Sequence, residues 1–119
     1  MDEATWRQAA TQRLQALAAT VREMTPGMVY GALCSASLLP VVTAANQGDF
    51  GALVALTGVV GGVGGNLIAN QIQGWKDRSE AELAAELAEK AQADDQWREA
   101  LDALLAEFQA PRTVQAVLA

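Results

Sequence analysis

The sequence contains no histidine and only one cysteine among its 119 residues. Without histidine, neither a Ser–His–Asp triad nor a Cys–His pair can form, and a lone Cys34 excludes an internal disulfide and a thiolate-rich metal site. Cys34 also lies in an apolar run with no neighbouring base, where its thiol should stay protonated. We therefore expect no enzymatic activity, no catalytic residue, no cofactor and no metal, in a protein of a reducing, cytoplasmic compartment.

Charge is almost absent from the middle of the chain. Between Thr25 and Trp75 the only formally charged residue is Asp49. A stretch of this kind belongs either inside a compact helical core or in a membrane. Aromatic residues make up only 5% of the chain, so its apolar mass is mainly alanine, leucine and valine, which favour close-packed helices. The predicted fold class is all-α.

Acidic residues dominate the C-terminal part. The formal net charge is −6, and ten acidic residues against four basic ones lie between Lys76 and Ala110. Without clustered lysine and arginine, we expect no nucleic-acid partner. A solvated helix face explains most of these carboxylates, and we predict that they meet a basic patch on a partner. The candidate interaction surface is Glu80, Glu82, Glu86, Glu89, Asp94, Asp95 and Asp102.

Hydrophobic spacing and turn signals predict a single domain of about six helices over residues 1–119, in which 110–119 could instead begin a linker. Ser79 and Glu82 match a capping box, Asp94 or Asp95 can begin the following helix, and Asp49 can cap the helix from Phe50. The expected helices are 2–24, two short ones within 28–45 divided at Pro40, 50–60, 66–76, one from 80, one from about 95 to 110, and a last one within 112–119.

The predicted core combines one apolar face from each of these helices. Its members are Trp6, Leu14, Leu17, Val21, Leu38, Leu53, Leu56, Ile68, Ile72, Leu83, Leu87, Trp97, Leu101, Leu105 and Phe108.

Five glycines occur within the eight residues from Gly58 to Gly65. A phosphate-binding loop is disfavoured, because no Gly-Lys-Ser/Thr follows and Leu67 occupies the last position of a G-x-G-x-x-G pattern. We expect a hinge or a close approach of two helices instead. Asn66 and Asn70 lie one turn apart and could bond a partner helix or, as we prefer, satisfy nearby backbone groups. The candidate packing and hinge residues are Gly58, Gly61, Gly62, Gly64, Gly65, Asn66 and Asn70.

A membrane hairpin is the main alternative. Residues 27–45 and 50–73 form two uncharged segments of nineteen and twenty-four residues, with Asp49 between them. Each segment could cross a bilayer core of about 30 Å. Pro40, Asn46 and Asn66 count against insertion, and the amphipathic flanks need an apolar partner that the middle can supply. We favour the bundle and rank a membrane partner lower.

The segment from Gly61 to Ile72 resembles a segment in N-terminal helical domains of bacterial NACHT and other STAND-type NTPases, which are NLR-like immune proteins. The resemblance covers about Leu53 to Asp77 and rests on a glycine-rich run followed by Asn-aliphatic spacing. It implies a death-fold-like or effector-associated adaptor without NTPase activity. We therefore expect a module that assembles a signalling or defence complex through homotypic or heterotypic helical contacts, with a protein partner or self-association. The alternative is a pore-forming or membrane-anchored glycine-rich hairpin.

Overall fold

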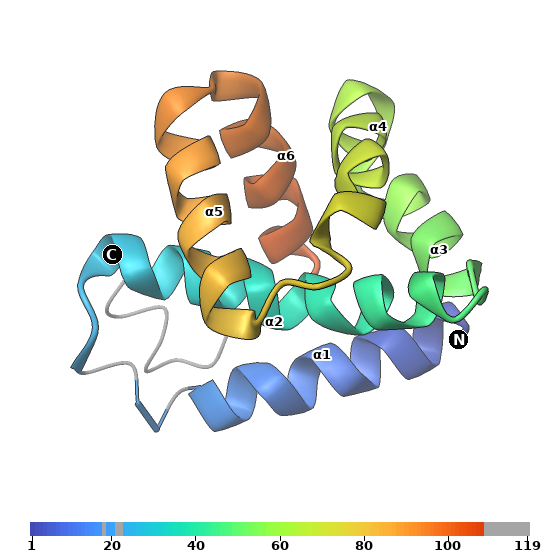
Figure 1. Cartoon of the computed structure of the whole chain (residues 1–119), viewed down its shortest axis with the longest axis horizontal. Coiled ribbons are helices and arrows are strands. Elements are labelled where there is room, and N and C mark those ends of the chain that lie inside the picture. The colour runs from blue at the N-terminus through green and yellow to red at the C-terminus, as the bar shows by residue number, and fades with distance from the viewer. Residues whose placement is uncertain (18, 21–22, 109–119) are drawn as a thin grey trace.

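The longest helix, α2 (Pro26–Asn46), runs through the middle of the structure, and the other helices pack around it (Figure 1). The structure is a computed structural model that describes residues 1–17, 19–20 and 23–108. Fourteen of the 21 residues in α2 are buried. Because other helices surround α2, its residues are apolar on every side, and this explains why charge is missing from this part of the sequence.

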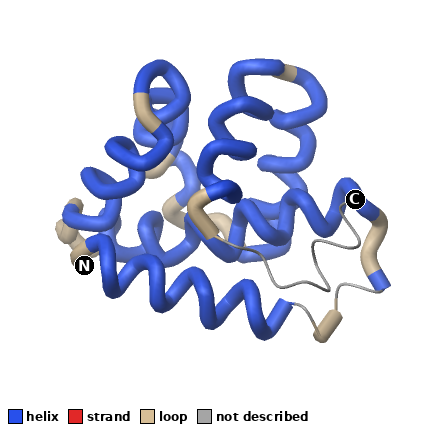
Figure 2. Tube along the Cα trace, turned by 180° about the vertical axis from the view of Figure 1, so that it is seen from behind, coloured by secondary structure: helices blue, strands red, loops and turns tan. Residues whose placement is uncertain are grey.

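The other helices form three units around α2. α1 (Glu3–Leu17) runs along one side, while the pair α3 (Gly51–Val60) and α4 (Gly62–Gln71) and the pair α5 (Glu80–Ala93) and α6 (Asp95–Ala106) rise on the other (Figure 1). A 3₁₀ turn, η2 (Gln73–Trp75), joins the two pairs. Figure 2 shows the same arrangement from behind, with helices as the only regular elements of the described residues. The all-α prediction with about six helices is confirmed.

The expected division at Pro40 is wrong, because α2 continues through that residue. Proline removes one backbone donor from the helix, but Pro40 and its surroundings are buried and packed from several sides. Tertiary packing therefore outweighs the lost hydrogen bond. At its start α2 is capped by Thr25, whose hydroxyl accepts the Met28 amide at 3.3 Å, with Pro26 in the first turn.

The first helix ends at Leu17, earlier than the expected Met24. Both the amide and the hydroxyl of Thr20 donate to the Leu17 carbonyl, at 3.0 and 3.1 Å. This local bonding replaces the next turn of helix. The apolar spacing that predicts a helix to Met24 therefore extends beyond the end of α1 at Leu17.

The break in the glycine cluster lies at Gly61 and Gly62, which both have positive φ, and α4 begins at Gly62, not at the expected Asn66. Gly61 has φ 73° and ψ 162°, a combination that is essentially restricted to glycine. Three glycines of the cluster then lie inside α4. The expected single helix to Lys76 is also wrong, since α4 ends at Gln71 and η2 follows.

The predicted capping box at the start of α5 is confirmed. Ser79 Oγ accepts the Glu82 amide at 3.1 Å, and a Glu82 carboxylate oxygen accepts the Ser79 amide at 3.1 Å. Asp94 caps α6 by accepting the amides of Gln96 and Trp97, and Asp95 is the first residue of that helix. Asp49 accepts the Gly51 amide at 3.2 Å and pairs with the N-terminal ammonium, but Phe50 holds the N-cap position of α3.

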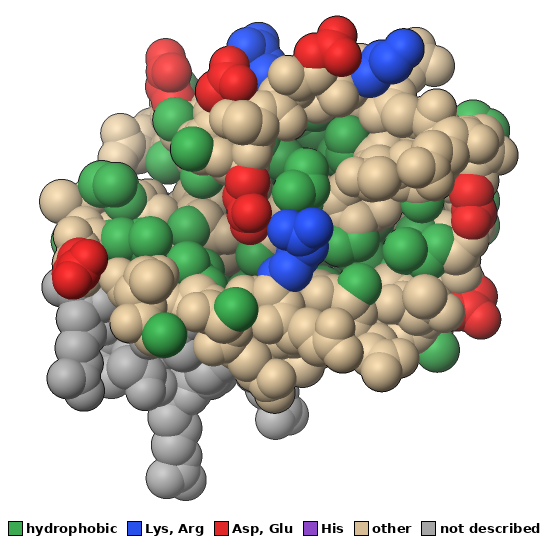
Figure 3. Space-filling view, turned by 60° about the horizontal axis from the view of Figure 1, so that its bottom comes forward, with side chains coloured by type: hydrophobic (Ala, Val, Ile, Leu, Met, Phe, Trp, Pro, Cys, Tyr) green, Lys and Arg blue, Asp and Glu red, His purple; other side chains and the backbone are tan. Residues whose placement is uncertain are grey.

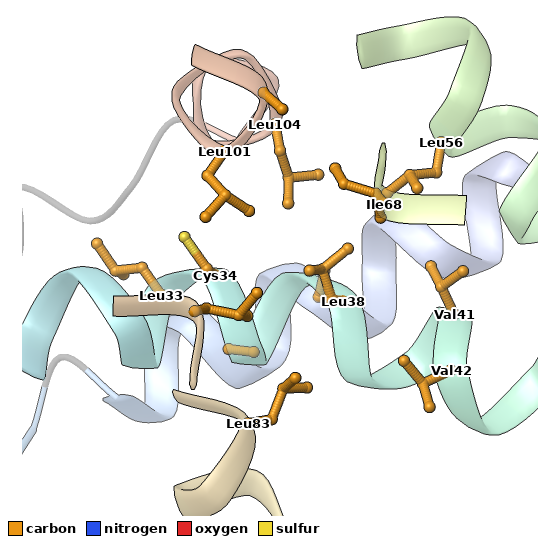
Figure 4. Close-up of a cluster of buried hydrophobic side chains, with 14 of the residues drawn as sticks. Leu33, Cys34, Leu38, Val41, Val42, Leu56, Ile68, Leu83, Leu101 and Leu104 are labelled. Carbon is orange, nitrogen blue, oxygen red and sulfur yellow. The ribbon is translucent and has the colours of Figure 1, made fainter. Parts of the chain in front are cut away.

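Side chains from α2, α3, α4, α5 and α6 gather in one buried hydrophobic cluster (Figure 4). Trp6 from α1 donates its indole N–H to the buried Ser37 carbonyl at 2.8 Å and meets the Phe108 ring edge-on at 5.4 Å. Most of the predicted core is buried, but Leu17, Leu53 and Leu105 are only partly buried against it. The prediction for Val21 lies outside the described residues, as does the one for the helix within 112–119.

The backbones of α2 and α5 approach each other closely at Gly31. A Cβ added there would overlap the Ala84 carbonyl oxygen and would lie 3.0 Å from the Ala88 Cβ. Glycine at this position lets the two backbones cross in direct contact. The sequence analysis did not single out Gly31, because it stands alone in an apolar run.

Candidate functional site

Three of the predicted acidic residues on α5 are engaged within the molecule. Glu80 pairs with Arg13 at 3.4 Å, which ties α5 to α1. Glu82 belongs to the capping box, and the Ser79 amide that it accepts holds the pKa of its carboxyl below the usual value. Glu86 pairs with Arg78 at 3.4 Å and accepts the indole N–H of Trp75. These carboxylates position elements of the fold.

Two further predicted acids also have internal partners. Asp94 caps α6. Asp102 accepts the Tyr30 hydroxyl at 2.7 Å and pairs with Arg98 at 3.2 Å, while Arg98 lies over the Tyr30 ring at 4.4 Å. Asp102 therefore joins α6 to α2.

The remaining acids face solvent. Glu89 and Asp95 are exposed and, within the described part of the chain, form no hydrogen bond or ion pair through their side chains. Glu99 has the same environment and lies one helical turn after Asp95, so the two carboxylates share one face of α6. Asp95 lies in the first turn of α6, where the N-terminal end of the helix dipole favours a negative charge. Glu99 lies beyond that turn, so its charge has no such role in the fold.

The glycine cluster meets α6 beside these carboxylates. A Cβ added at Gly64 would lie 2.9 Å from the Ala100 Cβ and 3.3 Å from the Ala100 Cα. Gly65 makes a similar approach to α3, with the Thr57 carbonyl oxygen 3.0 Å from an added Cβ. Gly58, Gly61 and Gly62 face open space. The five glycines thus divide into two contact positions, two with positive φ at the break between α3 and α4, and one exposed helical position.

A groove of about 420 Å³ lies between α4 and α6 at this contact. Gly64 and Ala100 meet at its base, and the apolar side chains of Val60, Val63 and Ala103 line it. Gln96 and Glu99 supply its polar lining. Val63 is 62% exposed, a large fraction for a valine, so this lining is open to a partner. We call it the α4–α6 groove.

Two other hollows have different linings. One of about 600 Å³, between α1, α2 and α5, is mostly apolar and includes the Glu80 and Arg13 pair. The face turned forward in Figure 3 shows hydrophobic side chains within its hollows and most of the charged ones near its edges. The other, of about 630 Å³, includes Phe50, Asn70 and Lys76. Neither is lined by a glycine of the cluster, whereas the α4–α6 groove combines Gly61 and Gly64 with one acidic residue, Glu99.

Asn66 and Asn70 are both exposed on α4. Their side chains make no hydrogen bond within the described residues, so the preferred local role in satisfying backbone groups is not seen there. Asn70 lines the hollow beside Lys76.

The buried titratable groups hold their protons. Burial raises the pKa of the Cys34 thiol, and burial likewise raises the pKa of the Tyr30 hydroxyl, which also donates to Asp102. Across residues 1–17, 19–20 and 23–108, no group of three or more cysteine, aspartate or glutamate side chains has the geometry of a metal site.

Sequence reasoning named Asp95 and Gly64 for this region but missed Glu99, Gln96 and Val63. The spacing of Gln96, Glu99, Ala100 and Ala103 at i, i+3, i+4 and i+7 does place them on one helix face. Which face of α6 lies beside the glycines could not be read from that spacing.

Comparison with protein-family models, with curated proteins and with solved structures finds no match to this chain.

Proposed function

We propose that the chain is a non-enzymatic interaction module that binds a basic, helical segment of a partner protein in the α4–α6 groove. The observation that carries this proposal is a solvent-facing carboxylate, Glu99, in the lining of a groove with mostly apolar side chains, with Asp95 one helical turn away. An aliphatic side chain of the partner would enter between Val63 and Ala103, while a lysine or arginine one turn away would pair with the carboxylates. Helix-in-groove recognition commonly combines such contacts.

The scale of the groove fits this mode of binding. Its volume of about 420 Å³ is near the lower end for small-molecule pockets, and its lining is mostly apolar. The charges lie at its exposed edge, where they would guide association and be screened by salt. The resemblance to effector-associated domains of bacterial NACHT and STAND proteins supports the proposal that binding assembles a signalling or defence complex in the cytoplasm.

A titration with synthetic peptides tests this proposal. We would add a helical Leu/Lys peptide to the isotopically labelled protein and follow the backbone amide signals by NMR. The expected shifts cluster at Val63, Gly64, Gln96, Glu99 and Ala100, and weaken as salt is raised. A Leu/Glu peptide of the same pattern should leave these signals unchanged.

Charge-reversal variants sharpen the experiment. Asp95→Lys with Glu99→Lys should abolish the clustered shifts, because the basic peptide then meets like charge. Asp77→Lys is the matched control, since Asp77 precedes α5 and so lies at the opposite end of the α5–α6 pair from Asp95. Shifts that move to Glu82 and Glu86, or that survive in the double variant, would show that the groove is not the binding site.

The membrane hairpin remains the second candidate, because one observation favours it. Among the described residues, α2 is long and apolar enough to cross a bilayer. Most of it is buried in this fold, and the second expected span is divided into α3 and α4 at Gly61, each with ten residues. Insertion would therefore require α2 to leave the core and α3 and α4 to join into one helix.

A further inference from the structure

Phe50 and Lys76 each differ from the other described residues of their kind. Phe50 is 53% exposed, whereas the other five aromatic side chains of the chain are at most 8% exposed. Among the basic side chains that the structure describes, every arginine forms an ion pair and Lys90 lies over the Trp97 ring at 5.0 Å. Lys76 is exposed and has neither kind of contact within the described part of the chain. Packing and ion pairing in the fold therefore leave much of one ring and one positive charge unused.

Both side chains line the same hollow, which has a volume of about 630 Å³. This volume lies within the range of about 300–1,000 Å³ that is usual for small-molecule sites. Phe50 immediately precedes α3, and Lys76 immediately follows η2. The carboxyl-terminal residues of α2 and α4 form the rest of the wall. The hollow shares no residue with the α4–α6 groove, so it is a second, separate candidate site.

Three exposed amide side chains, from Asn46, Asn70 and Gln73, add polar groups to the lining. The Asn46 amide donates to the Val42 carbonyl at 2.8 Å, and this bond orients the amide while its oxygen accepts no hydrogen bond from another described residue. The side chains of Asn70 and Gln73 form no hydrogen bond with any described residue. Since an amide side chain offers both donors and acceptors, the hollow can bond the polar groups of a ligand.

The charge of the lining selects the ligand. The formal net charge of the chain is −6, yet among the described residues no acidic side chain lines this hollow. The helix ends in its wall carry partial negative charge, so a bound anion would have to lie at the Lys76 ammonium. A cationic ligand would meet like charge there, and an aliphatic one would leave the ammonium and the amides unpaired. The exposed Phe50 ring favours a planar aromatic group, because aromatic rings stack on one another.

We propose that this hollow binds a small aromatic carboxylate, whose ring stacks on Phe50 and whose carboxylate pairs with Lys76. Asn70 and Gln73 bond to the remaining polar groups of the ligand. This inference goes beyond the proposed binding of a peptide and does not depend on it.

A titration of the isotopically labelled full chain with 2-naphthoate tests the site by NMR. The side-chain amide signals of Asn46, Asn70 and Gln73 and the backbone amide of Lys76 should shift and reach saturation. The shifts should weaken as salt is raised, because salt screens the exposed charge pair. 2-Naphthylmethylamine has the same rings with a cationic group, and it should leave these signals unchanged.

Variants of Lys76 and Phe50 separate the two contacts. Lys76→Gln should raise the Kd by about two- to fivefold, as expected for an exposed ion pair, whereas Lys76→Arg should preserve binding. Lys90→Gln is the matched control, since it removes the same charge from α5 outside the hollow. Phe50→Leu should also raise the Kd, because it keeps an apolar side chain and removes the ring. Circular dichroism checks that each variant remains folded.

The inference is overturned if 2-naphthoate gives no saturable shifts, or if the shifts lie away from the hollow. It is also overturned if the amine gives the same shifts, or if Lys76→Gln and Lys90→Gln have equal affinity. Neither Phe50 nor Lys76 lines the α4–α6 groove, so peptide binding should persist in these variants. Loss of naphthoate binding with intact peptide binding is therefore the expected result for Lys76→Gln, and failure of the peptide experiment contradicts only the proposed groove function.

Discussion

At the scale of the residue, glycines of similar appearance in the sequence have different physical roles. Gly31 and Gly64 stand where another helix touches the backbone, Gly61 supplies a conformation that other residues rarely adopt, and Gly58 faces open space. The environment of each glycine decides its role. The glycine that the fold needs most, Gly31, lies outside the glycine-rich cluster.

Substitution of Gly31 tests this distinction. Gly31→Ala should lower the free energy of unfolding by about 1–3 kcal/mol, because the added methyl group overlaps the Ala84 carbonyl and overpacks the α2–α5 crossing. Gly58→Ala, the matched control, should raise the free energy of unfolding by up to about 1 kcal/mol, since it adds helix propensity without a clash. Urea unfolding of the dilute monomer measures both. Equal effects of the two changes would contradict the assignment.

At the scale of the element, side chains outside the core determine where the helices begin. Thr25, Ser79 and Asp94 each accept amides from the first turn of the helix that follows. These caps satisfy backbone donors that a helix leaves free at its start. The uncharged α3 has no side-chain cap hydrogen bond at Phe50, and its start depends on packing and on Asp49 accepting the Gly51 amide.

The capping box predicts a dependence of stability on pH. The pKa of Glu82 is lowered in the folded state, mainly by the Ser79 amide, so the unfolded chain binds more protons in the acidic range. The contribution of the Glu82 charge should be present above pH 4.5, the ordinary value, and be lost as pH falls through the lowered value. Glu82→Gln keeps an acceptor for the Ser79 amide and removes the charge.

Thermal unfolding of the wild type and of Glu82→Gln at neutral and strongly acidic pH measures this effect. At neutral pH the wild type should have a higher melting temperature than Glu82→Gln. The difference in melting temperature between the two proteins should shrink at strongly acidic pH. A difference that is independent of pH would show that the Glu82 charge does not stabilise α5.

Local signals in the sequence were sufficient for the capping box, for the helical class and for much of the core. They failed where distant contacts decide. Pro40 remains inside α2 because its surroundings pack around it, and the break between α3 and α4 involves only two of the five clustered glycines, Gly61 and Gly62. The seven acids of the predicted surface looked alike in the sequence, yet only the folded chain places Arg13 beside Glu80 and Tyr30 beside Asp102.

At the scale of the whole molecule, charge is separated along the chain and in space. The uncharged middle forms the central helix and the α3–α4 pair, while α5 and α6 carry the acidic excess. Binding of a basic peptide at the acidic edge of the α4–α6 groove should therefore weaken as salt is raised.

The most direct test of an interaction module that works as a folded bundle in water is size-exclusion chromatography with light scattering, without detergent, at low and high salt. The expected result is a discrete species recovered without detergent, either a monomer or an oligomer whose mass depends on salt. Protein that can be recovered only with detergent would contradict the account, and would favour insertion of α2 into a membrane.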